Sequence, residues 1–519
     1  MTTSTDAEVT IVGGGFGGLS AACHLADAGV DVTIVEKNEA VGGRASRLER
    51  DGFVFDMGPS WYLMPEVFER FFEHFGHEPE DYYELERLDP HYRIFFKDSE
   101  AGSASERSSG QALQAGSDVV DISANRNENR ELFESYEDGA GEAFDAYLTT
   151  SHRHYEMSME NFVYEYRPSW KDWIDPSLMK TGTLGLKLFQ SMQGHVEDYF
   201  ENEKLQQIVQ YTLVFLGGSP SNTPAIYNMM SHADFNLGVY YPQPVDGGPG
   251  GIGAVVDAIV DLAEELGVTI ETDTEVTEIT RRKDGFLLEA ADGDQRRPDV
   301  VVANADYAHA EQDLMPAHER QYDADYWDDR TYAPSAFLLY LGIEGEVPEL
   351  EHHSLVFPTD WGEYFDDIFE DPAWPEDPSY YLCVPSKTDD DVAPEGHTNL
   401  FALVPIATEL DDPQETRDRY RDKIIADIAE NTGVELEDRI VVEEQFSISE
   451  FADRYNATKG TAMGLAHTLR QTAMLRPPIE SSAVEDLYFT GGYSTPGVGV
   501  PMCLISGEHA AEAVLENSR

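Results

Sequence analysis

The N-terminal residues alternate short apolar runs with a glycine-rich turn. Residues 9–12 (Val-Thr-Ile-Val) have the length and composition of a buried strand, and the glycine-rich stretch 13–18 follows directly. Apolar residues then recur at helical spacing over 19–26, and residues 32–35 form a second apolar run that ends at Glu36. This order predicts a strand, a tight turn, a helix, a second strand and an acidic residue at its end.

Similar periodicities divide the rest of the chain. Residues 130–240 have a mainly helical pattern, and the glycine-rich stretch 247–253 opens a further helix that runs to Leu266. Apolar runs predict strands at 268–270, 274–279, 300–306, 337–341, 399–404 and 486–490, followed by a helix at 504–515. Together these elements predict an α/β fold.

Composition and charge narrow the class of protein. The chain has 519 residues, of which 41% are hydrophobic, which suffices for more than one core and for two or three domains. Ninety-nine acidic residues against 35 basic ones give a formal net charge of -64, spread along the whole chain. This charge argues against nucleic-acid binding. It favours a cytoplasm rich in salt, because molar ions screen self-repulsion beyond about 3 Å.

The cysteines and the apolar runs exclude further classes. Cys23, Cys383 and Cys503 form no Cys-x-x-Cys pair, so neither a disulfide framework nor a zinc or iron–sulfur site is expected. Residues 1–10 are polar and acidic, unlike a signal peptide, and no apolar run reaches the roughly 18 residues of a membrane-spanning helix. The expected location is the cytoplasm, with or without peripheral contact with the inner face of the cell membrane.

The first turn has the spacing of a dinucleotide-binding site. Gly13 permits the tight turn, Gly15 lets a pyrophosphate approach the backbone, and Gly18 lets the helix pack closely on the strand. The helix N-terminus offers unpaired N–H groups and a partial positive charge to the phosphates. Glu36, about 20 residues further on, can accept hydrogen bonds from ribose hydroxyls. A glycine-rich turn without a ligand would leave the placement of this acid unexplained.

A second glycine pair carries a resemblance to a known family. Gly43 and Arg44 follow the second strand and offer a phosphate-facing loop with a guanidinium, and a Gly-Phe-x-Phe-Asp-x-Gly-Pro-Ser motif (52–60) comes next. This stretch resembles the N-terminus of the bacterial-type phytoene desaturases, a carotenoid desaturase family within the amine-oxidase-like FAD flavoproteins. The resemblance implies FAD contacts at Gly13, Gly15, Gly18, Glu36, Gly43, Arg44 and Gly58.

The resemblance continues along nearly the whole chain apart from residues 99–118. It includes stretches at 61–65, 88–93, 211–220 and 223–225. In this family the backbone at the position of Val276 meets the adenine. The glycine-rich stretch 486–501 resembles the family's C-terminal FAD signature, and it implies Gly491, Gly492, Gly499 and Val500 as contacts. Ser494-Thr495-Pro496 stands where many members have Thr-His-Pro, so the residues nearest the flavin are left open.

The family pattern predicts a divided architecture. A Rossmann-like FAD-binding domain is discontinuous and takes residues 1–95, 247–310 and 451–519. Residues 96–246 form a helical substrate or membrane-contacting region, in which the Gly/Ser-rich stretch 99–118 reads as a flexible insertion at a hairpin tip. Residues 311–450 complete an α+β substrate domain with a mixed sheet.

Residues 166–189 contrast with the acidic background. They hold three of the ten lysines together with tryptophans and aliphatic residues. A cationic, tryptophan-bearing, apolar stretch suits a membrane interface, where an apolar substrate could enter. An ordinary domain-packing helix explains the same pattern equally well.

Two pairs of histidines are the remaining candidate ligands. His152 and His154, and the adjacent His352 and His353, have no nearby cysteine or carboxylate at a known ligand spacing. Histidines in exposed loops are the favoured interpretation, so no metal site is expected.

The resemblance implies an enzyme that removes hydrogen from a long polyene, most directly phytoene towards lycopene. The flavin would accept a hydride from an allylic C–H, a neighbouring proton would leave, and a quinone or oxygen would reoxidise the flavin. Such chemistry needs a long dry tunnel more than a strong base, so no catalytic residue is named. Three alternatives stay open: a later carotenoid 3,4-desaturase, a non-redox flavin isomerase, and a carotenoid-binding protein with structural FAD.

Overall fold

A five-stranded parallel sheet organises the dinucleotide-binding half of the molecule. The computed structural model describes residues 7–97, 119–168, 171, 190–468 and 470–517. The strand order is β19-β13-β1-β2-β9, and every neighbouring pair is parallel. The strands are β1 (Glu8–Val12), β2 (Asp31–Val35), β9 (Thr269–Glu271), β13 (Val300–Ala303) and β19 (Leu487–Phe489). They come from three separate stretches of the chain, so the prediction of a discontinuous Rossmann-like domain is confirmed.

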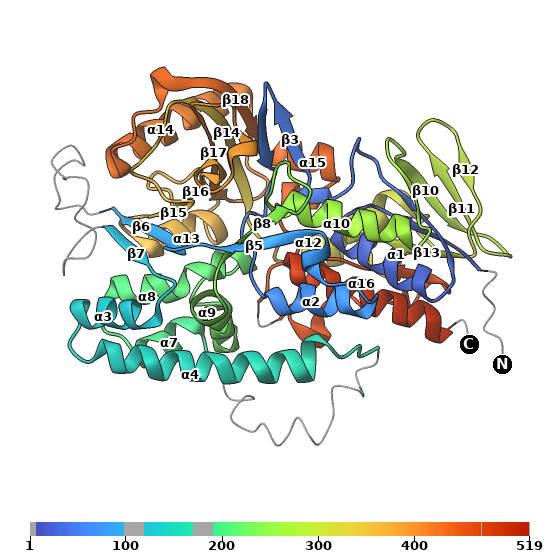
Figure 1. Cartoon of the computed structure of the whole chain (residues 1–519). Coiled ribbons are helices and arrows are strands. Elements are labelled where there is room, and N and C mark those ends of the chain that lie inside the picture. The colour runs from blue at the N-terminus through green and yellow to red at the C-terminus, as the bar shows by residue number, and fades with distance from the viewer. Residues whose placement is uncertain (1–6, 98–118, 169–170, 172–189, 469, 518–519) are drawn as a thin grey trace.

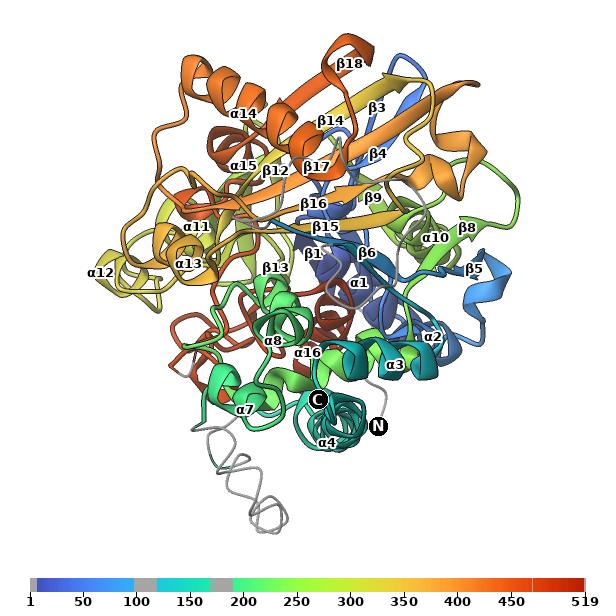
Figure 2. The ribbon, with the colours of Figure 1, turned by 90° about the vertical axis from the view of Figure 1, so that its left-hand side faces the viewer.

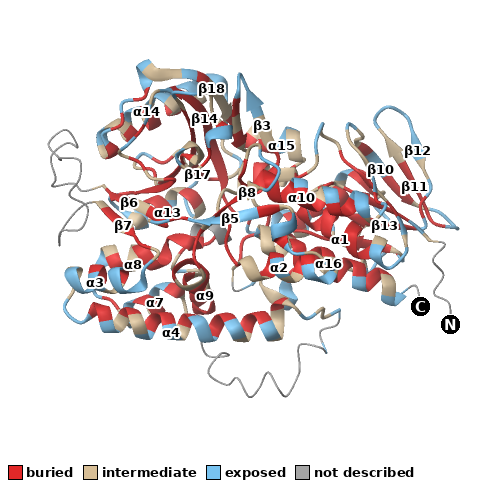
Figure 3. Ribbon diagram, viewed as in Figure 1, coloured by how far each residue is buried: buried red, intermediate tan, exposed pale blue. Residues whose placement is uncertain are grey.

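Helices cover this sheet and pack against one another. They are α1 (Phe16–Asp27), α2 (Pro65–His74), α10 (Ile252–Glu265) and α16 (Val500–Asn517). Helix α1 is buried along nearly its whole length, as Figure 3 shows, and it packs on both α10 and α16. The approach of α16 depends on Gly507, because a Cβ there would lie 2.5 Å from the carbonyl oxygen of Gly17. The N-terminal and C-terminal segments are thereby joined in one layer.

Smaller antiparallel units surround the parallel sheet. A three-stranded sheet lies at the far right of Figure 1, and there are two further antiparallel strand pairs. The three strands are β10 (Val276–Arg281), β11 (Phe286–Ala290) and β12 (Gln295–Arg296), and the pairs are β3 (Arg47–Arg50) with β4 (Phe53–Asp56) and β5 (Tyr83–Arg87) with β8 (Tyr240–Pro244). The partly buried carboxylate of Asp56 accepts hydrogen bonds from the N–H groups of Ile252 and Gly253. Asp56, from the motif at 52–60, therefore caps helix α10.

A seven-stranded mixed sheet forms the second half. Its order is β18-β14-β17-β16-β15-β6-β7, with β15 and β6 parallel and the other pairs antiparallel. The strands are β6 (Tyr92–Phe96), β7 (Val119–Ile122), β14 (Ser335–Glu344), β15 (His353–Phe357), β16 (Tyr380–Cys383), β17 (His397–Ile406) and β18 (Ile440–Phe446). The expected domain boundary at residue 95 falls inside β6. Residues 99–118 lie between the antiparallel strands β6 and β7, and they are outside the described part of the chain.

The two faces of this sheet are covered by different helices. Along β14, Phe337, Leu339 and Leu341 belong to the core with α14 (Gln414–Thr432), whereas Leu338 and Tyr340 belong to the core with the helical region. Successive side chains of a strand point to opposite faces, which explains the alternation. The helical region comprises α3 (Arg126–Tyr136), α4 (Ala140–Ser158), α7 (Met192–Glu197), α8 (Glu203–Gln210) and α9 (Met229–His232). Figures 1 and 2 both show α14 above the sheet and α4 below it.

The remaining helices are short and join these layers. They are α11 (Tyr307–His309), α12 (Ala324–Asp328), α13 (Trp361–Phe369) and α15 (Ile448–Tyr455). Among the described residues, no helix has both the length and the apolar character needed to cross a membrane. Of the segment 166–189, only residues 166–168 and 171 are described, so the predicted membrane contact falls almost wholly outside the described residues.

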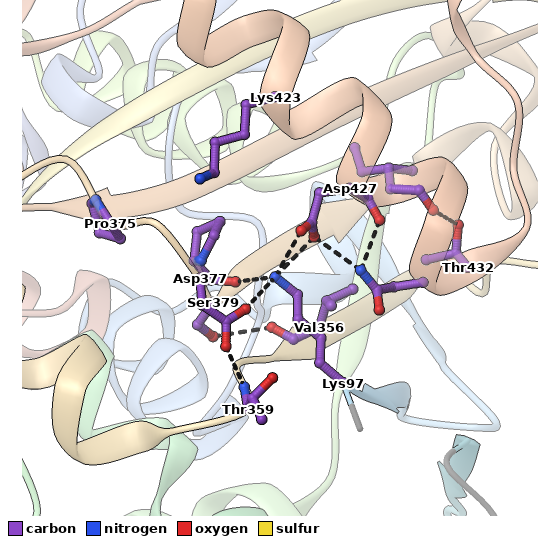
Figure 4. A network of polar contacts seen from close by, with 12 residues as sticks. Lys97, Val356, Thr359, Pro375, Asp377, Ser379, Lys423, Asp427 and Thr432 are labelled. Carbon is purple, nitrogen blue, oxygen red and sulfur yellow. Dashed lines mark hydrogen bonds and ion pairs between the residues drawn. The ribbon is translucent and has the colours of Figure 1, made fainter. Parts of the chain in front are cut away.

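A buried lysine ties the end of β6 to α14. The Lys97 ammonium donates to Asp377 (3.0 Å) and to the carbonyl oxygen of Pro378 (2.8 Å), and it lies 2.8 Å from a carboxylate oxygen of Asp427 on α14. Figure 4 shows these contacts converging on the ammonium. The ring of Tyr380 lies 5.2 Å from the same nitrogen. A single cation therefore connects a strand, a helix and a loop that are far apart in sequence.

Candidate active site

One large cavity brings the predicted cofactor residues together. It has a volume of about 830 Å³, and it reaches from the ends of β1, β2 and β13 into the space between the large sheet and the helical region. Eleven of the twelve predicted residues line it: Gly13, Gly15, Glu36, Gly43, Arg44, Gly58, Val276, Gly491, Gly492, Gly499 and Val500. Gly18 does not line the cavity and lies behind the turn.

The first glycine turn has no room for side chains. Gly13 has a φ of +103°, a region that L side chains rarely adopt. A Cβ on Gly18 would lie 2.2 Å from the carbonyl oxygen of Gly13, which accounts for this glycine by packing alone. No side chain caps the N-terminus of α1 at Gly15, and Gly15, Phe16 and Gly17 face the cavity. The first N–H groups of the helix are thus directed at the place expected for a pyrophosphate.

Asn304 holds this turn from the neighbouring strand, and sequence reasoning missed its role. Its Nδ2 donates to the carbonyl oxygen of Gly13 (3.0 Å), and a Cβ on Gly491 would lie 2.9 Å from its Oδ1. Asn304 follows β13 directly, and β13 pairs with β1. The strand order changes direction between β1 and β13, which is where open α/β sheets bind ligands. The available signal was an amide directly after a run of four apolar residues.

Glu36 is fixed by its own chain at the end of β2. One carboxylate oxygen accepts from the N–H of Gly14 (2.8 Å), and the other accepts from the backbone N–H and side-chain amide of Asn38 (2.9 and 2.8 Å). The side chain is buried and borders the cavity. This geometry holds a negative charge at the position expected for a ribose, with lone pairs still available to hydroxyl donors.

Arg44 presents an unpaired donor. Its Nε is buried without a hydrogen-bond partner, and its guanidinium lies 3.5 Å from the carbonyl oxygen of Thr461 and 5.7 Å from the ring centre of Tyr455. A buried donor without a partner is costly, and a phosphate oxygen would satisfy it. A Cβ on Gly43 would lie 3.4 Å from Gly15, so the two glycine turns are in contact. These features fit the diphosphate of a dinucleotide.

The C-terminal glycine loop forms the other wall of the cavity. The N–H of Gly491 donates to Ser506 Oγ (3.0 Å), which also lies 3.0 Å from Ser494 Oγ. Ser494 and Thr495 both belong to the segment that differs from the family's Thr-His-Pro. Ser494 is fully buried, whereas Thr495 lines the cavity. Val500 begins α16, so this helix also directs its N-terminus at the cavity.

Three further residues support this loop, and none was singled out from sequence: Arg476 lies behind the loop, whereas His467 and Tyr227 also line the cavity. Arg476 donates to main-chain carbonyl groups of the loop, and the N–H of Val498 donates to His467 Nε2 (3.1 Å). His467 Nδ1 lies 2.7 Å from the hydroxyl of Tyr227, and burial holds the pKa of this histidine well below its usual range. The expected neutral ring can accept the hydrogen bond from Val498.

Beyond the glycine turns the cavity becomes apolar. Eight of the chain's 13 methionines line it: Met57, Met64, Met159, Met229, Met230, Met463, Met474 and Met502. Trp61, Leu338 and Leu403 complete the wall against the large sheet. Methionine side chains are flexible and polarisable, so they conform to irregular apolar ligands. The cavity therefore joins a polar cradle to a chamber suited to a long hydrocarbon.

The histidine pairs are placed differently from the prediction. His154 lies in α4 and is buried against Asn228, and His352 and His353 are buried at the start of β15, so exposed loops were the wrong expectation. His352, His353 and Cys383 bring one potential ligand atom each within 4.8 Å of one another. Within this group, Cys383 Sγ lies 3.8 Å from His353 Nδ1, a separation that also suits a hydrogen bond from the thiol.

The other contacts of this group are those of a packed aromatic cluster. His353 Nδ1 lies 2.7 Å from the hydroxyl of Tyr381, and the ring stacks on Trp61 at 4.3 Å. His352 Nδ1 lies 2.6 Å from Thr388 Oγ1, and burial lowers the pKa of His352 to about 3. Neutral rings in these positions build the wall of the chamber behind Trp61.

Comparison with known proteins agrees with this geometry. The sequence pattern of the family described as flavin containing amine oxidoreductase matches residues 16–515. A carotenoid 3,4-desaturase of Haloarcula japonica is 66% identical over 510 residues, which cover 98% of both chains. A 4,4'-diapophytoene desaturase of Staphylococcus haemolyticus is 33% identical, over 98% of this chain and 99% of that protein.

Solved structures share the fold at low sequence identity. An oxidoreductase from Methanosarcina mazei superposes with a TM-score of 0.61 at 16% identity, covering 97% of this chain and 100% of that one. The glycine cradle and the unpaired Arg44 donor fit the cofactor that this family uses. The chain therefore belongs to the flavin-containing amine oxidoreductases and, within them, to the carotenoid desaturase family, as a haloarchaeal FAD-dependent oxidoreductase.

Proposed function

We propose that the protein desaturates a carotenoid at the 3,4 position of a lycopene-type chain. The observation that carries this choice is the 66% identity with the carotenoid 3,4-desaturase of Haloarcula japonica over 98% of both chains. The desaturation of phytoene towards lycopene, which the sequence motifs first favoured, is the second candidate. The support for this second candidate is similarity to more distant relatives, such as the zeta-carotene-forming phytoene desaturase of Myxococcus xanthus, which is 33% identical.

The cavity supports a reaction of this kind by its division into two parts. Bound FAD would accept a hydride from an allylic C–H of the polyene, and a proton then leaves the neighbouring carbon. Trp61, Leu338 and most of the methionines line the inner part of the cavity and would shield the substrate chain from water. A quinone or oxygen would reoxidise the cofactor after each turnover.

The rim of the cavity supports entry from a lipid phase. Met474 borders the cavity, and it and Leu475 are about half exposed, at 51% each. Large apolar side chains that are exposed to solvent are typical of a surface that contacts lipid. With the predicted interfacial segment 166–189, they support a peripheral contact with the inner face of the membrane.

Pigment analysis tests the assignment. The protein is produced with FAD in molar KCl and supplied separately with phytoene and with lycopene, whose 3,4 bond is single, in lipid vesicles. A product two hydrogens lighter than lycopene for each end that is desaturated, with phytoene unchanged, is expected. Desaturated phytoene would favour the second candidate instead. Conversion without a change of mass would indicate an isomerase. Binding without conversion would indicate a carotenoid-binding protein.

A further inference from the structure

The most unusual charge in the molecule lies behind the C-terminal glycine loop. Arg476 is only 5% exposed, and within the described part of the chain no carboxylate pairs with its guanidinium. Burial lowers the pKa of its guanidinium to about 10, and the nearby ionisable side chains are tyrosines and a cysteine, whose own pKa values burial raises. A buried cation is costly without a charged partner, which calls for an explanation beyond packing.

The guanidinium gathers main-chain carbonyl groups from one side of the loop. It donates to Gly492 (2.5 Å), Tyr493 (3.2 Å) and Ser494 (3.3 Å), and also to Leu465 and Gln471. Its Cζ lies 3.6 Å from the position of a Cβ on Gly497. The loop therefore rests directly on the cation.

This arrangement gives the opposite side of the loop a positive character. In a trans peptide the C=O and the following N–H point in opposite directions. Carbonyl groups turned towards Arg476 therefore turn the N–H groups of Tyr493, Ser494 and Thr495 away from it, and both Tyr493 and Thr495 line the cavity. The charge and the peptide dipoles add at this wall.

This wall, formed by the glycine loop, borders the position that the reacting ring of a bound FAD would take. Glu36 and Arg44 mark the ribose and phosphate positions at one end of the cavity, and the apolar chamber occupies the other end. The ring of a bound FAD would lie between the cradle and the chamber, and most residues of the loop 491–500 line the cavity.

We propose that Arg476 is a positioning residue that acts through the loop to stabilise negative charge on the reduced flavin ring. Transfer of a hydride adds two electrons to the ring, and the charge spreads over its N1 and C2 carbonyl edge. A cation fixed behind the loop lowers the energy of that state relative to the oxidised one. The inference rests on the proposed function only in placing FAD in this cavity.

The test uses sulfite, which adds its lone pair to the flavin N5 and leaves the same negative charge on the ring. The full-length holoprotein is titrated with sulfite in molar KCl, and the loss of visible flavin absorbance gives the Kd. R476Q removes the charge, R476K keeps it, and R320Q is the matched control. Arg320 also donates to main-chain carbonyl groups, those of Met315 and Gln312, but neither of these residues belongs to the glycine loop.

We expect R476Q to weaken sulfite binding by about tenfold or more and to lower the midpoint potential, with R320Q unchanged. R476K should stay near the wild type at neutral pH. It should lose sulfite affinity as pH rises, because a buried lysine has a lowered pKa and deprotonates. A flavin-loaded R476Q with wild-type sulfite affinity would overturn the proposal.

If R476Q does not fold, R476K decides, since a sulfite affinity whose pH profile runs parallel to that of the wild type would contradict a role for the charge. These readouts need no carotenoid. A wild type that binds sulfite but leaves every polyene unchanged would refute the proposed function alone.

Discussion

At the scale of single residues, Asp234 is the clearest titrating group outside the cavity. It is buried and accepts hydrogen bonds from the hydroxyls of Tyr92 (2.8 Å) and Tyr211 (3.1 Å). Burial raises the pKa of this carboxyl to about 7, against the lowering effect of the two tyrosines. The residue joins the helical region to strand β6, so its protonation affects two elements at once.

This predicts a pH dependence of stability. The folded-state pKa lies above the unfolded value, so the stabilisation from protonation is complete below about pH 4 and is lost as pH rises through about 7. D234N lacks this titration. The difference in unfolding free energy between wild type and D234N should fall by about 3–4 kcal/mol from pH 4 to pH 8, measured by denaturant titration in molar KCl. D246N, at an exposed position, should follow the wild type, and a difference constant with pH would refute the assignment.

Some residues of the site could be predicted from a short stretch of sequence, and others could not. Gly13, Gly15 and Glu36 could be predicted because turn, helix and strand follow one another within a short segment. Asn304 and Arg476 could not, because each acts on a turn that only folding brings near, and an isolated amide or arginine has no distinguishing spacing. Gly18, which the resemblance also assigned to the cofactor, does not line the cavity, and a Cβ there would lie 2.2 Å from the carbonyl oxygen of Gly13.

At the scale of elements, Lys97 predicts a measurable link between β6 and α14. Its side chain is 6% exposed, and replacing it by methionine leaves Asp427 (18% exposed) without its cation. We expect K97M to lower the free energy of unfolding by about 2–4 kcal/mol, since breaking a buried ion pair strands a charge. Chemical denaturation in molar KCl measures the change.

A neighbouring lysine supplies the control for this experiment. Lys423 lies on α14, the helix that carries Asp427, and its partner Glu376 is 94% exposed. K423M should change the free energy of unfolding by less than about 0.5 kcal/mol, because exposed ion pairs contribute little. Equal losses of unfolding free energy in K97M and K423M would show that the buried ion pair stabilises the fold no more than the exposed one.

Strands with strong apolar runs were predictable, and the pairing of distant strands was not. Residues 337–341 and 399–404 were expected as strands, and β14 and β17 contain them. The parallel pairing of β6 with β15 joins Arg93 to Ser354, and nothing in either segment specifies its partner. Pairing depends on packing on both faces of the sheet, which a single segment does not reveal.

At the scale of the whole molecule, the net charge of -64 dominates the response to salt. Raising the ionic strength from 0.1 M to 1 M shortens the screening length from about 10 Å to about 3 Å. We expect the melting temperature to rise steadily with KCl into the molar range, as followed by circular dichroism. Equal stability in dilute and in molar KCl would show that self-repulsion does not limit the fold.

A charge-reduced variant separates screening from other effects of salt. Glu363, Asp366 and Glu370 are exposed on or directly after α13, and their combined replacement by Gln, Asn and Gln removes three negative charges. This variant should reach a given melting temperature at a lower KCl concentration than the wild type. A neutral osmolyte should affect both proteins equally, since it does not screen charge.

The dinucleotide-binding sheet takes its last strand, β19, from residues near 488, and α16 then covers α1. A ribosome releases β1, α1 and β2 first, so these nascent elements wait for almost the entire length of translation before their partners emerge. Until then the side of α1 that α16 covers stays exposed, and exposed apolar surface favours aggregation. Cofactor loading is therefore a late event, and the newly made N-terminal segment is the part of the chain with the greatest need for a chaperone.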